Sequence, residues 1–347
     1  MVGRLKRQEA DMESCGIDLA VGSSAICVMR DGGVIVRERV VPTDETGLQA
    51  AVAGRARMLC VLEASPLAEW AAGVLEMAGH DVVVIDPRKA KGVITSKKKT
   101  DKLDARNLAR MGLTGWYTEV HRKSPEARAM RTFLQARYGL VQTALAQGSR
   151  IRGLLRAHGI KLGRVAESQF ASRVRQVTKQ QAPGLWPMLE PLVKVWRQAL
   201  EGAEQMKKQI ALRAAAEGVP RRLMTAPGVG PLVASAYVAT IDDPRRFRSS
   251  SQVPAYLGLV SSVEQSGEQE IHGRITREGD GLLRTYLIEA AAVLLTRTRR
   301  SCALKRWGLR LWRKKGFGKA RVAVARKLAI LLHHLWITGE NFDPAGA

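Results

Sequence analysis

The sequence lacks the features of a membrane-spanning, secreted or disulfide-stabilised protein. It contains no run of about 18 consecutive apolar residues, so no transmembrane helix is expected. Residues 1–14 are charged and include no apolar segment, which predicts no secretory signal and a cytoplasmic location. The four cysteines are scattered, with no Cys-x-x-Cys pair and no histidine at ligand spacing, so we expect reduced thiols and no zinc site.

Acidic residues are scarce relative to basic ones. The chain has 56 Lys and Arg against 32 Asp and Glu, a formal net charge of +24. Residues 1–150 carry 23 basic and 17 acidic side chains and residues 151–347 carry 33 and 15, so the excess lies mainly in the second part. Because each contacted phosphate releases counterions, nucleic acid is the expected partner, and a merely solvated basic surface is the alternative. Only 5% of residues are aromatic, which disfavours recognition by base stacking.

The length of 347 residues predicts more than one domain. The first part alternates between short Val- and Ile-rich segments and helical patterns. The expected strands are 15–19, 24–30, 34–41, 58–63 and 82–85, and the expected helices start near 43, 66 and 100. Three strands followed by helix, strand, helix, strand and helix are typical of a ribonuclease-H-like (RuvC-like) α/β domain, expected over residues 1–120.

The remainder is expected to be helical. Two amphipathic helices, up to about His158 and from Leu185 to Ile210, are joined by a basic polar linker at 161–183. They predict a helical coiled-coil insertion over residues 121–218, as an antiparallel pair within one chain or as a coil between chains. Residues 219–347 are expected to form a mainly helical C-terminal domain.

Four carboxylates stand out in the first domain. Asp18 and Glu63 end the first and fourth expected strands, which are neighbours in a ribonuclease-H-like sheet, and Asp101 and Asp104 share one helix face. Clustered carboxylates suit Mg²⁺, and two such ions can hold the attacking and leaving oxygens of a phosphodiester. The basic run Lys97, Lys98 and Lys99 precedes the helix. Taken singly, these acids also fit turn residues or a solvated helix face.

The segment Ala226–Gly230 resembles a helix-hairpin-helix turn. Gly228 and Gly230 could let backbone N–H groups approach a phosphate, although a Pro-Gly-x-Gly sequence is also a common helix-breaking turn.

Ser266 lies in a polar segment that is expected to be a loop, followed by Arg274, Arg277 and Arg284. A serine is a poor nucleophile unless it loses its proton and cations offset the developing charge, and Arg274 and Arg277 are the candidates for that role. The spacing to His272 suggests no catalytic triad, so the residues alone leave Ser266 a weak candidate.

The stretch Ala290–Gly339 contains thirteen Lys or Arg and no acid. This pattern indicates a basic helical surface for a nucleic-acid backbone. Its named candidates are Arg313, Lys314, Lys315 and Lys319. Trp307 and Trp312 are expected to pack within the protein.

Several motifs occur together in an informative order. They are Gly16-Ile17-Asp18, Leu62-Glu63-Ala64, the segment Lys99–Ala109, Pro227-Gly228-Val229-Gly230, the segment Ala255–Leu259, Gln265-Ser266-Gly267, Gly273-Arg274-Ile275-Thr276 and the segment Lys319–Leu328. In this order they resemble the DEDD transposases of bacterial insertion sequences, the family typified by insertion sequence 110 and described as bridge-RNA-guided recombinases. The chain departs from the family pattern at Ala20, Ser65-Pro66 and Val260.

The resemblance implies a transposase that cuts and rejoins DNA. Asp18, Glu63, Asp101 and Asp104 match the Mg²⁺-binding acids, and Ser266 matches a serine that attacks the phosphodiester and becomes covalently linked to DNA. By the same resemblance, a structured bridge RNA is expected to pair with donor and target DNA, and the enzyme is expected to act as a homo-oligomer, a dimer or tetramer.

Two other functions fit some of the same residues. A two-metal junction resolvase or nuclease needs the four acids but neither Ser266 nor an RNA. A nucleic-acid-binding protein without activity needs only the basic tail.

Overall fold

The computed structural model describes residues 12–86, 100–266 and 269–344, without the side chains of residues 263–272. The predicted basic residues Lys97, Lys98 and Lys99 lie outside the described residues. The chain divides into two compact units, residues 1–122 and 123–347. The three-domain division expected from the sequence stays a prediction.

The first unit is a five-stranded mixed sheet with the strand order β3-β2-β1-β4-β5. The three N-terminal strands pair antiparallel, and β4 and β5 extend the sheet parallel to β1. The elements are β1 (Glu13–Leu19), β2 (Ser23–Arg30), β3 (Val34–Pro42), α1 (Glu45–Val52), β4 (Leu59–Glu63), α2 (Ala68–Met77), β5 (Asp81–Ile85) and α4 (Asp101–Thr114). This mixed sheet is compatible with the predicted ribonuclease-H-like domain, and the expected pairing of the first and fourth strands is confirmed.

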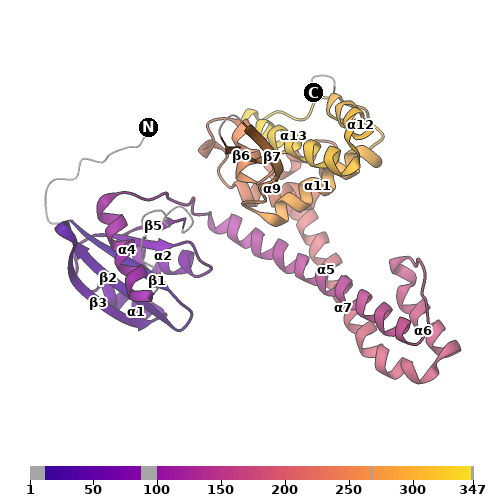
Figure 1. Cartoon of the computed structure of the whole chain (residues 1–347), viewed down its shortest axis with the longest axis horizontal. Helices are drawn as coiled ribbons and strands as arrows, with labels where there is room; N and C mark the ends of the chain where they lie inside the picture. The colour runs from indigo at the N-terminus through magenta and orange to yellow at the C-terminus, as the bar shows by residue number, and fades with distance from the viewer. Residues whose placement is uncertain (1–11, 87–99, 267–268, 345–347) are drawn as a thin grey trace. The chain divides into compact units, whose positions relative to one another are not determined.

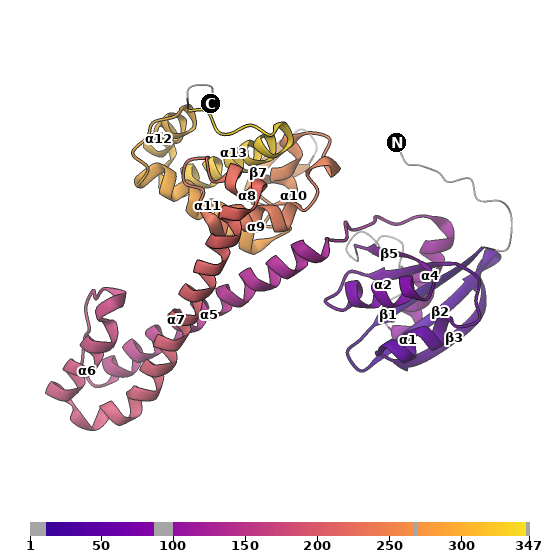
Figure 2. The same ribbon diagram turned by 180° about the vertical axis from the view of Figure 1, so that it is seen from behind.

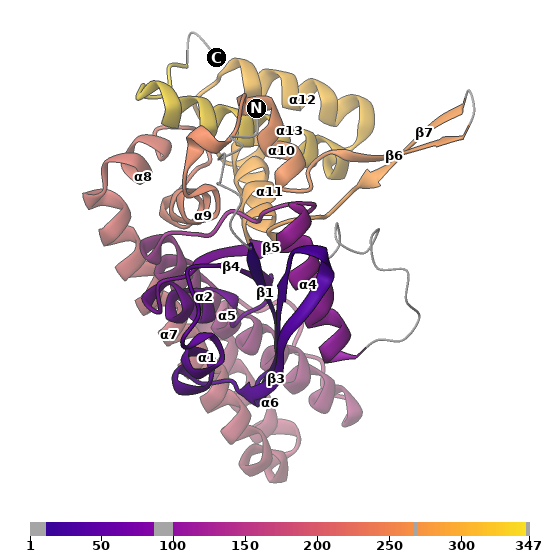
Figure 3. The same cartoon turned by 90° about the vertical axis from the view of Figure 1, so that its left-hand side faces the viewer.

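Helices cover both faces of this sheet (Figure 3). Alternate residues of β1 face opposite ways, as the period of two in a strand requires. Cys15 and Ile17 pack with α1 and α2 in one apolar cluster. Ser14 and Gly16, which alternate with them, face α4, and α4 packs on β1, β2 and β4.

The second unit starts with a helical hairpin. It consists of α5 (Pro125–Ala157), α6 (Phe170–Gln181) and α7 (Trp186–Ala216). The long helices α5 and α7 lie side by side within the chain, with α6 at the far end of the pair (Figures 1 and 2). Of the two arrangements that the sequence left open, the structure therefore has the pair within one chain.

The expected linker at 161–183 is not only a linker, and this prediction was wrong in part. It contains α6, whose Phe170, Val174 and Val177 are buried in a cluster with α5 and α7. The spacing of these three side chains follows one helix face, and the exposed face is polar, with Arg173, Arg175 and Lys179 among serine and glutamine residues.

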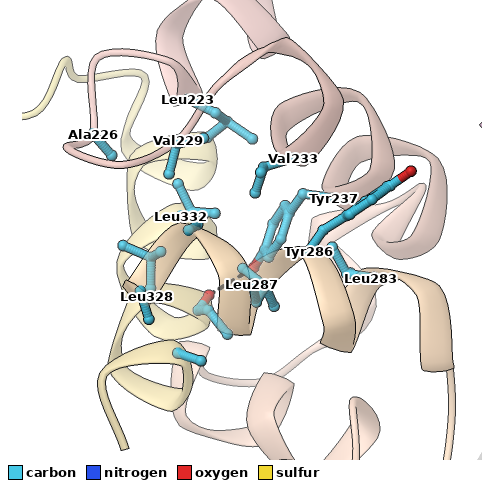
Figure 4. Close-up of a cluster of buried hydrophobic side chains, with 14 of the residues drawn as sticks. Leu223, Ala226, Val229, Val233, Tyr237, Leu283, Tyr286, Leu287, Leu328 and Leu332 are labelled. Carbon is cyan, nitrogen blue, oxygen red and sulfur yellow. Dashed lines mark hydrogen bonds between the residues drawn. The ribbon is translucent and has the colours of Figure 1, made fainter. Parts of the chain in front are cut away.

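The C-terminal part of the second unit is a bundle around one core. It comprises α8 (Gly218–Leu223), α9 (Pro231–Ile241), α10 (Val253–Tyr256), β6 (Ser261–Ser266), β7 (Gln269–Ile275), α11 (Gly281–Thr296), α12 (Ala303–Lys315) and α13 (Phe317–Thr338). Figure 4 shows side chains from α8, α9, α11 and α13 meeting in the core. Within it, the Tyr237 hydroxyl donates a hydrogen bond of 2.7 Å to the Ala329 carbonyl, so the buried phenol is satisfied.

The hairpin of β6 and β7 was not expected from the sequence. Its strands pair antiparallel with a bulge between Ser261 and Val263. Ser266 is thus the last residue of a strand instead of a loop residue. In the described part of the chain, no helix combines the length and the apolar character that crossing a membrane requires.

Candidate active site

Asp18 and Glu63 stand at the same edge of the sheet. Ile17 of β1 pairs with Leu62 of β4 in parallel register, and each acid is the next residue along its strand. Both side chains are half-buried. Because carboxyl ends of parallel strands meet at one edge, the register places the two acids next to each other on neighbouring strands.

The same two acids lie on the sheet face that α4 covers. A Cβ at Gly16 would lie 2.0 Å from the Ala105 carbonyl oxygen, and the Val61 side chain would meet a Cβ at Gly112 at 2.9 Å. Asp18 and Glu63 are each two residues further along these strands, so they share the face of Gly16 and Val61.

The direction of α4 brings its first turn to this edge. Ser14 of β1 lies against Gly112, whereas Gly16 lies against Ala105, so α4 runs antiparallel to β1. Continuing this progression by two strand residues places Asp18 opposite the first turn of α4, which contains Asp101 and Asp104. All four predicted acids are therefore brought to one face and one edge of the sheet.

Local interactions hold the first turn of α4 in place. The Thr100 hydroxyl caps the helix by accepting from the Leu103 N–H at 3.3 Å, and acids near a helix N-terminus interact favourably with its dipole. Arg106 donates from Nε and Nη2 to both carboxylate oxygens of Glu38 on β3, at 2.6 and 2.8 Å. This pair lowers the pKa of Glu38, first through the hydrogen bond, and anchors α4 across the sheet.

The donor chemistry of the four acids suits a hard cation. Carboxylate oxygens are the ligands that Mg²⁺ prefers, and the Ser65 hydroxyl, two residues after Glu63, is buried without a hydrogen-bond partner among the described residues. The acids are nevertheless not drawn tightly together: within residues 12–86, 100–266 and 269–344, no three His, Cys, Asp or Glu side chains form a metal-binding group. The positions of the four acids on one face and edge are compatible with a cation site, and their metal-binding role stays a prediction.

Ser266 lies in the second unit, where it pairs with Gln269 across the hairpin. Ile275 pairs with Ser261, at the opposite end of the hairpin. Five strand residues span about 16 Å, so Arg274 and Arg277 lie far from Ser266 within one chain. The hairpin register thus separates these two arginines from Ser266 within one chain, and their proposed role in offsetting charge at the phosphate stays a prediction.

Gly228 has a packing role in the turn between α8 and α9. Its φ is +83°, and a Cβ there would lie 2.5 Å from the Ala290 carbonyl oxygen of α11. Val229 and Ala226 point into the core (Figure 4). Gly230 is the N-cap residue of α9 and has open space around its α-carbon, so it is the better placed of the two glycines to approach a phosphate.

Arg284 holds loops together. Its Nη1 donates to the carbonyl oxygens of Leu257 and Glu278, both at 2.9 Å. These bonds tie α11 to the segments before β6 and after β7. The structure thus shows a positioning role for Arg284, and its predicted phosphate contact remains untested.

The basic tail is largely exposed on α12 and α13. Arg313, Lys314, Lys315 and Lys319 are all exposed, and none makes an ion pair with an acid in the described part of the chain. Trp307 and Trp312 pack against the core, as expected.

Two residues that position α4 on the sheet are not found by searching the sequence for reactive side chains. Gly16 and Gly112 carry no functional side chain, yet their lack of one allows α4 to approach the sheet. The signal that could have found them is a glycine in the interior of a strand and of a helix, where glycine is unfavourable without a close contact.

Comparison with known proteins gives consistent matches. Residues 15–160 match a family model for DEDD transposases of the IS110 type, described as "Transposase", and residues 220–307 match the "Transposase IS116/IS110/IS902 family". The chain is 32% identical to a "Probable family 20 transposase" of Pseudomonas aeruginosa over 281 residues, 79% of this chain and 82% of that protein. It is 27% identical to the "Transposase for insertion sequence element IS1111A" of Coxiella burnetii over 343 residues, 97% of this chain and 93% of that protein.

Proposed function

Because the chain belongs to the IS110/IS116 family of DEDD transposases, enzymes that act on DNA in transposition, we propose that it is an RNA-guided DNA recombinase that works through a serine–DNA intermediate. The observation that carries the proposal is the register of β1, β4 and α4, which gathers Asp18, Glu63, Asp101 and Asp104 at one edge of the sheet. Four carboxylates on one face repel one another, which favours a cation between them.

In this proposal the four acids hold Mg²⁺. The ion supplies charge stabilisation at the oxygens of the reacting phosphate. Asp18 and Glu63 are held by the sheet, whereas Asp101 and Asp104 are held by α4. The sheet and the capped helix hold the backbone of the proposed ligands in place.

Ser266 is the proposed nucleophile. Its Oγ loses a proton to a base and forms a new bond to phosphorus, while one phosphate ester bond of the DNA breaks and the leaving hydroxyl takes up a proton. The number of phosphodiester bonds stays the same. The hydroxyl of another DNA strand can therefore attack the serine–DNA bond, release Ser266 and rejoin the DNA. The backbone register supports this role by placing Ser266 at the end of a protruding strand pair (Figure 3).

The proposed partners are donor and target DNA, a structured bridge RNA and further copies of the chain. The net charge of +24 supports polyanionic partners. The alternative function is a two-metal junction resolvase or nuclease, which the acid cluster supports equally but which assigns no role to Ser266.

The test of RNA guidance is a recombination assay with purified protein and plasmids that carry the element ends and the insertion site. We expect recombinants only when a transcript of the element's non-coding flank is added. A transcript with its pairing segments scrambled is the matched control. Recombination without any RNA would overturn the guided mechanism, and cutting without rejoining would favour the nuclease.

A further inference from the structure

The far end of the α5–α7 hairpin carries a concentrated positive charge. Residues 150–185, which we call the hairpin tip, contain eight Lys or Arg and one acid, Glu167. The eight are Arg150, Arg152, Arg156, Lys161, Arg164, Arg173, Arg175 and Lys179. The hairpin stem, residues 125–149 and 186–217, is longer but contains eight basic and five acidic residues, so the charge excess belongs to the tip.

Stem and tip also differ in how their charges are paired. In the stem, Lys194 lies 3.5 Å from Glu190 and Lys207 lies 3.1 Å from Glu204, as on an ordinary solvated helix face. No basic side chain of the tip makes an ion pair with an acid among the described residues. The charges of the tip are therefore not compensated by any acid in the described part of the chain.

Only two of the eight have a clear structural role. Arg152 donates to the Gly163 carbonyl at 2.8 Å and its guanidinium lies 5.1 Å from the Phe170 ring centre. Arg175 lies 5.7 Å from the ring centre of Trp186. Four of the others are exposed and make no hydrogen bond or ion pair within the described residues: Arg156, Lys161, Arg164 and Lys179. Arg150 and Arg173 are also exposed, and each donates only to a glutamine side chain on its own helix, Gln147 and Gln176 respectively.

An open groove of about 610 Å³ lies in this charged region. Its polar lining consists of Arg164, Gln169, Ser172, Arg173 and Gln176, and its apolar lining of Leu162 and Val165. Guanidinium, amide and hydroxyl groups are the donors that typically contact phosphate and sugar oxygens. The groove thus combines charge with hydrogen-bond donors.

The surface chemistry of the hairpin tip favours a nucleic-acid backbone over a membrane or a second copy of the chain. The outer face of α6 presents Ser, Arg, Gln and Lys without an aromatic or large aliphatic residue, so it lacks the apolar side that a membrane-bound helix inserts. A second copy of this chain carries the same strong positive charge and offers little complementary surface. A sugar–phosphate backbone fits both the charge and the donors.

We propose that the hairpin tip is a second phosphate-backbone site, which binds a duplex segment of DNA or of structured RNA. It lies away from the basic tail, since Leu155 in the tip cluster is about 30 Å along α5 from Leu134 in the C-terminal core. The inference rests on the proposed function in one respect, that the chain handles nucleic acid. It assigns the tip a task separate from the acids and Ser266.

The test compares the full-length chain with the triple variant Arg156→Gln, Arg164→Gln and Arg173→Gln. The matched control removes the same number of charges from the stem: Arg197→Gln, Lys207→Gln and Lys208→Gln. Binding of a labelled DNA duplex and of a labelled RNA hairpin is measured by fluorescence anisotropy across a salt series. The tip variant should flatten the log–log salt slope by about 2–3 for at least one of the two probes, and the stem control should leave both slopes near wild type.

The two probes distinguish the sources of the phosphate backbone. Flattening with RNA alone assigns the tip to RNA, and flattening with DNA alone assigns it to DNA. Equal slopes for the tip variant and the wild type, with thermal unfolding unchanged, would overturn the proposal. So would a tip variant that alters only self-association in sedimentation or only binding to phosphatidylglycerol vesicles. DNA cleavage by the stem and tip variants is measured in a separate assay. A tip variant that binds like wild type therefore leaves the recombinase proposal standing, whereas a wild-type chain that binds neither probe rejects both the tip site and the recombinase.

Discussion

Gly16 of β1 lies so close to Ala105 of α4 that a Cβ on the glycine would be 2.0 Å from the Ala105 carbonyl oxygen. The contact joins two backbones, so no flexible side chain can move aside. It sets the distance between the strand that carries Asp18 and the helix that carries Asp101 and Asp104. The geometry of the acid cluster thus depends on a residue without a side chain.

Gly16→Ala should therefore displace α4 and lower the free energy of unfolding by about 1–3 kcal/mol, the usual range for overpacking. DNA cleavage should fall with it, because the acids move apart. The control is Gly73→Ala in α2, where a Cβ meets nothing within 4 Å and should stabilise slightly. Urea unfolding of both variants checks this, and a Gly16→Ala chain as stable as wild type would contradict the packing argument.

The sheet and the placement of the four acids at one of its edges could be predicted, because the sequence signals for both are local and strong. The buried strands are rich in Val and Ile, and each acid ends or follows a clear element. The order of the elements then implies which strands are neighbours. The closeness of α4 to Gly16 could not be predicted, because it depends on packing between residues far apart in sequence.

The β6–β7 hairpin illustrates the opposite case. The strand Ser261–Ser266 reads Ser-Ser-Val-Glu-Gln-Ser, with one apolar residue and no alternation, so its sequence favours a loop. Its strand conformation is supported by backbone pairing with β7, which the local sequence does not reveal. That pairing also sets Arg274 apart from Ser266, a separation that sequence spacing alone cannot reveal.

Asp104→Asn should reduce strand cleavage in Mg²⁺ by more than about 100-fold, since even outer-shell partners of metal ligands contribute up to that factor. Nucleic-acid binding should stay near wild type, because the net charge becomes slightly more favourable to phosphate. The control is Asp31→Asn, an equal charge change at an exposed position in the turn between β2 and β3. Cleavage on a labelled substrate is the measurement, and normal cleavage by Asp104→Asn would reject the metal site.

His80 should make the stability of the first unit depend on pH. It is buried, its Nδ1 accepts from the Met58 N–H at 3.4 Å, and burial lowers its pKa below the usual value of about 6.5. Below about pH 6.5 the unfolded chain therefore binds a proton at His80 that the folded chain does not bind. The stability that neutral His80 contributes is present above about pH 6.5 and is lost as the pH falls below it. Urea midpoints between neutral and mildly acidic pH should show the decline in wild type and a smaller one in His80→Gln. The exposed His158→Gln should behave like wild type.

Neutralising Lys314, Lys315 and Lys319 together should flatten the log–log salt dependence of DNA binding by about 2–3, because three fewer phosphates release their counterions. The stem variant Arg197→Gln, Lys207→Gln and Lys208→Gln is the control with the same loss of charge. Anisotropy titrations over a salt series measure the slope. An unchanged slope would remove this part of the tail from the interface.

Ser266→Ala separates the recombinase from the nuclease. If the Ser266 oxygen attacks phosphorus, the cut DNA end stays bonded to the protein until a DNA hydroxyl displaces it. A substrate with a gap near the cut leaves no hydroxyl in position, so the wild-type chain should accumulate protein–DNA adduct that survives denaturing gel electrophoresis. Ser266→Ala should yield neither adduct nor recombinant while still binding DNA.

The controls lie on the same hairpin. Ser261 and Ser262 occupy the same strand as Ser266 but lie at its other end, about 13–16 Å away, so Ser261→Ala and Ser262→Ala should still form the adduct. Mapping the adduct by peptide mass spectrometry should find the DNA on the peptide that contains Ser266. An adduct on another residue would reject Ser266 as the nucleophile. Efficient cutting by wild type with no covalent species would instead assign the reaction to water activated at the four acids. Asp104→Asn would then remove all cleavage whereas Ser266→Ala would remove none, which is the pattern of the two-metal nuclease.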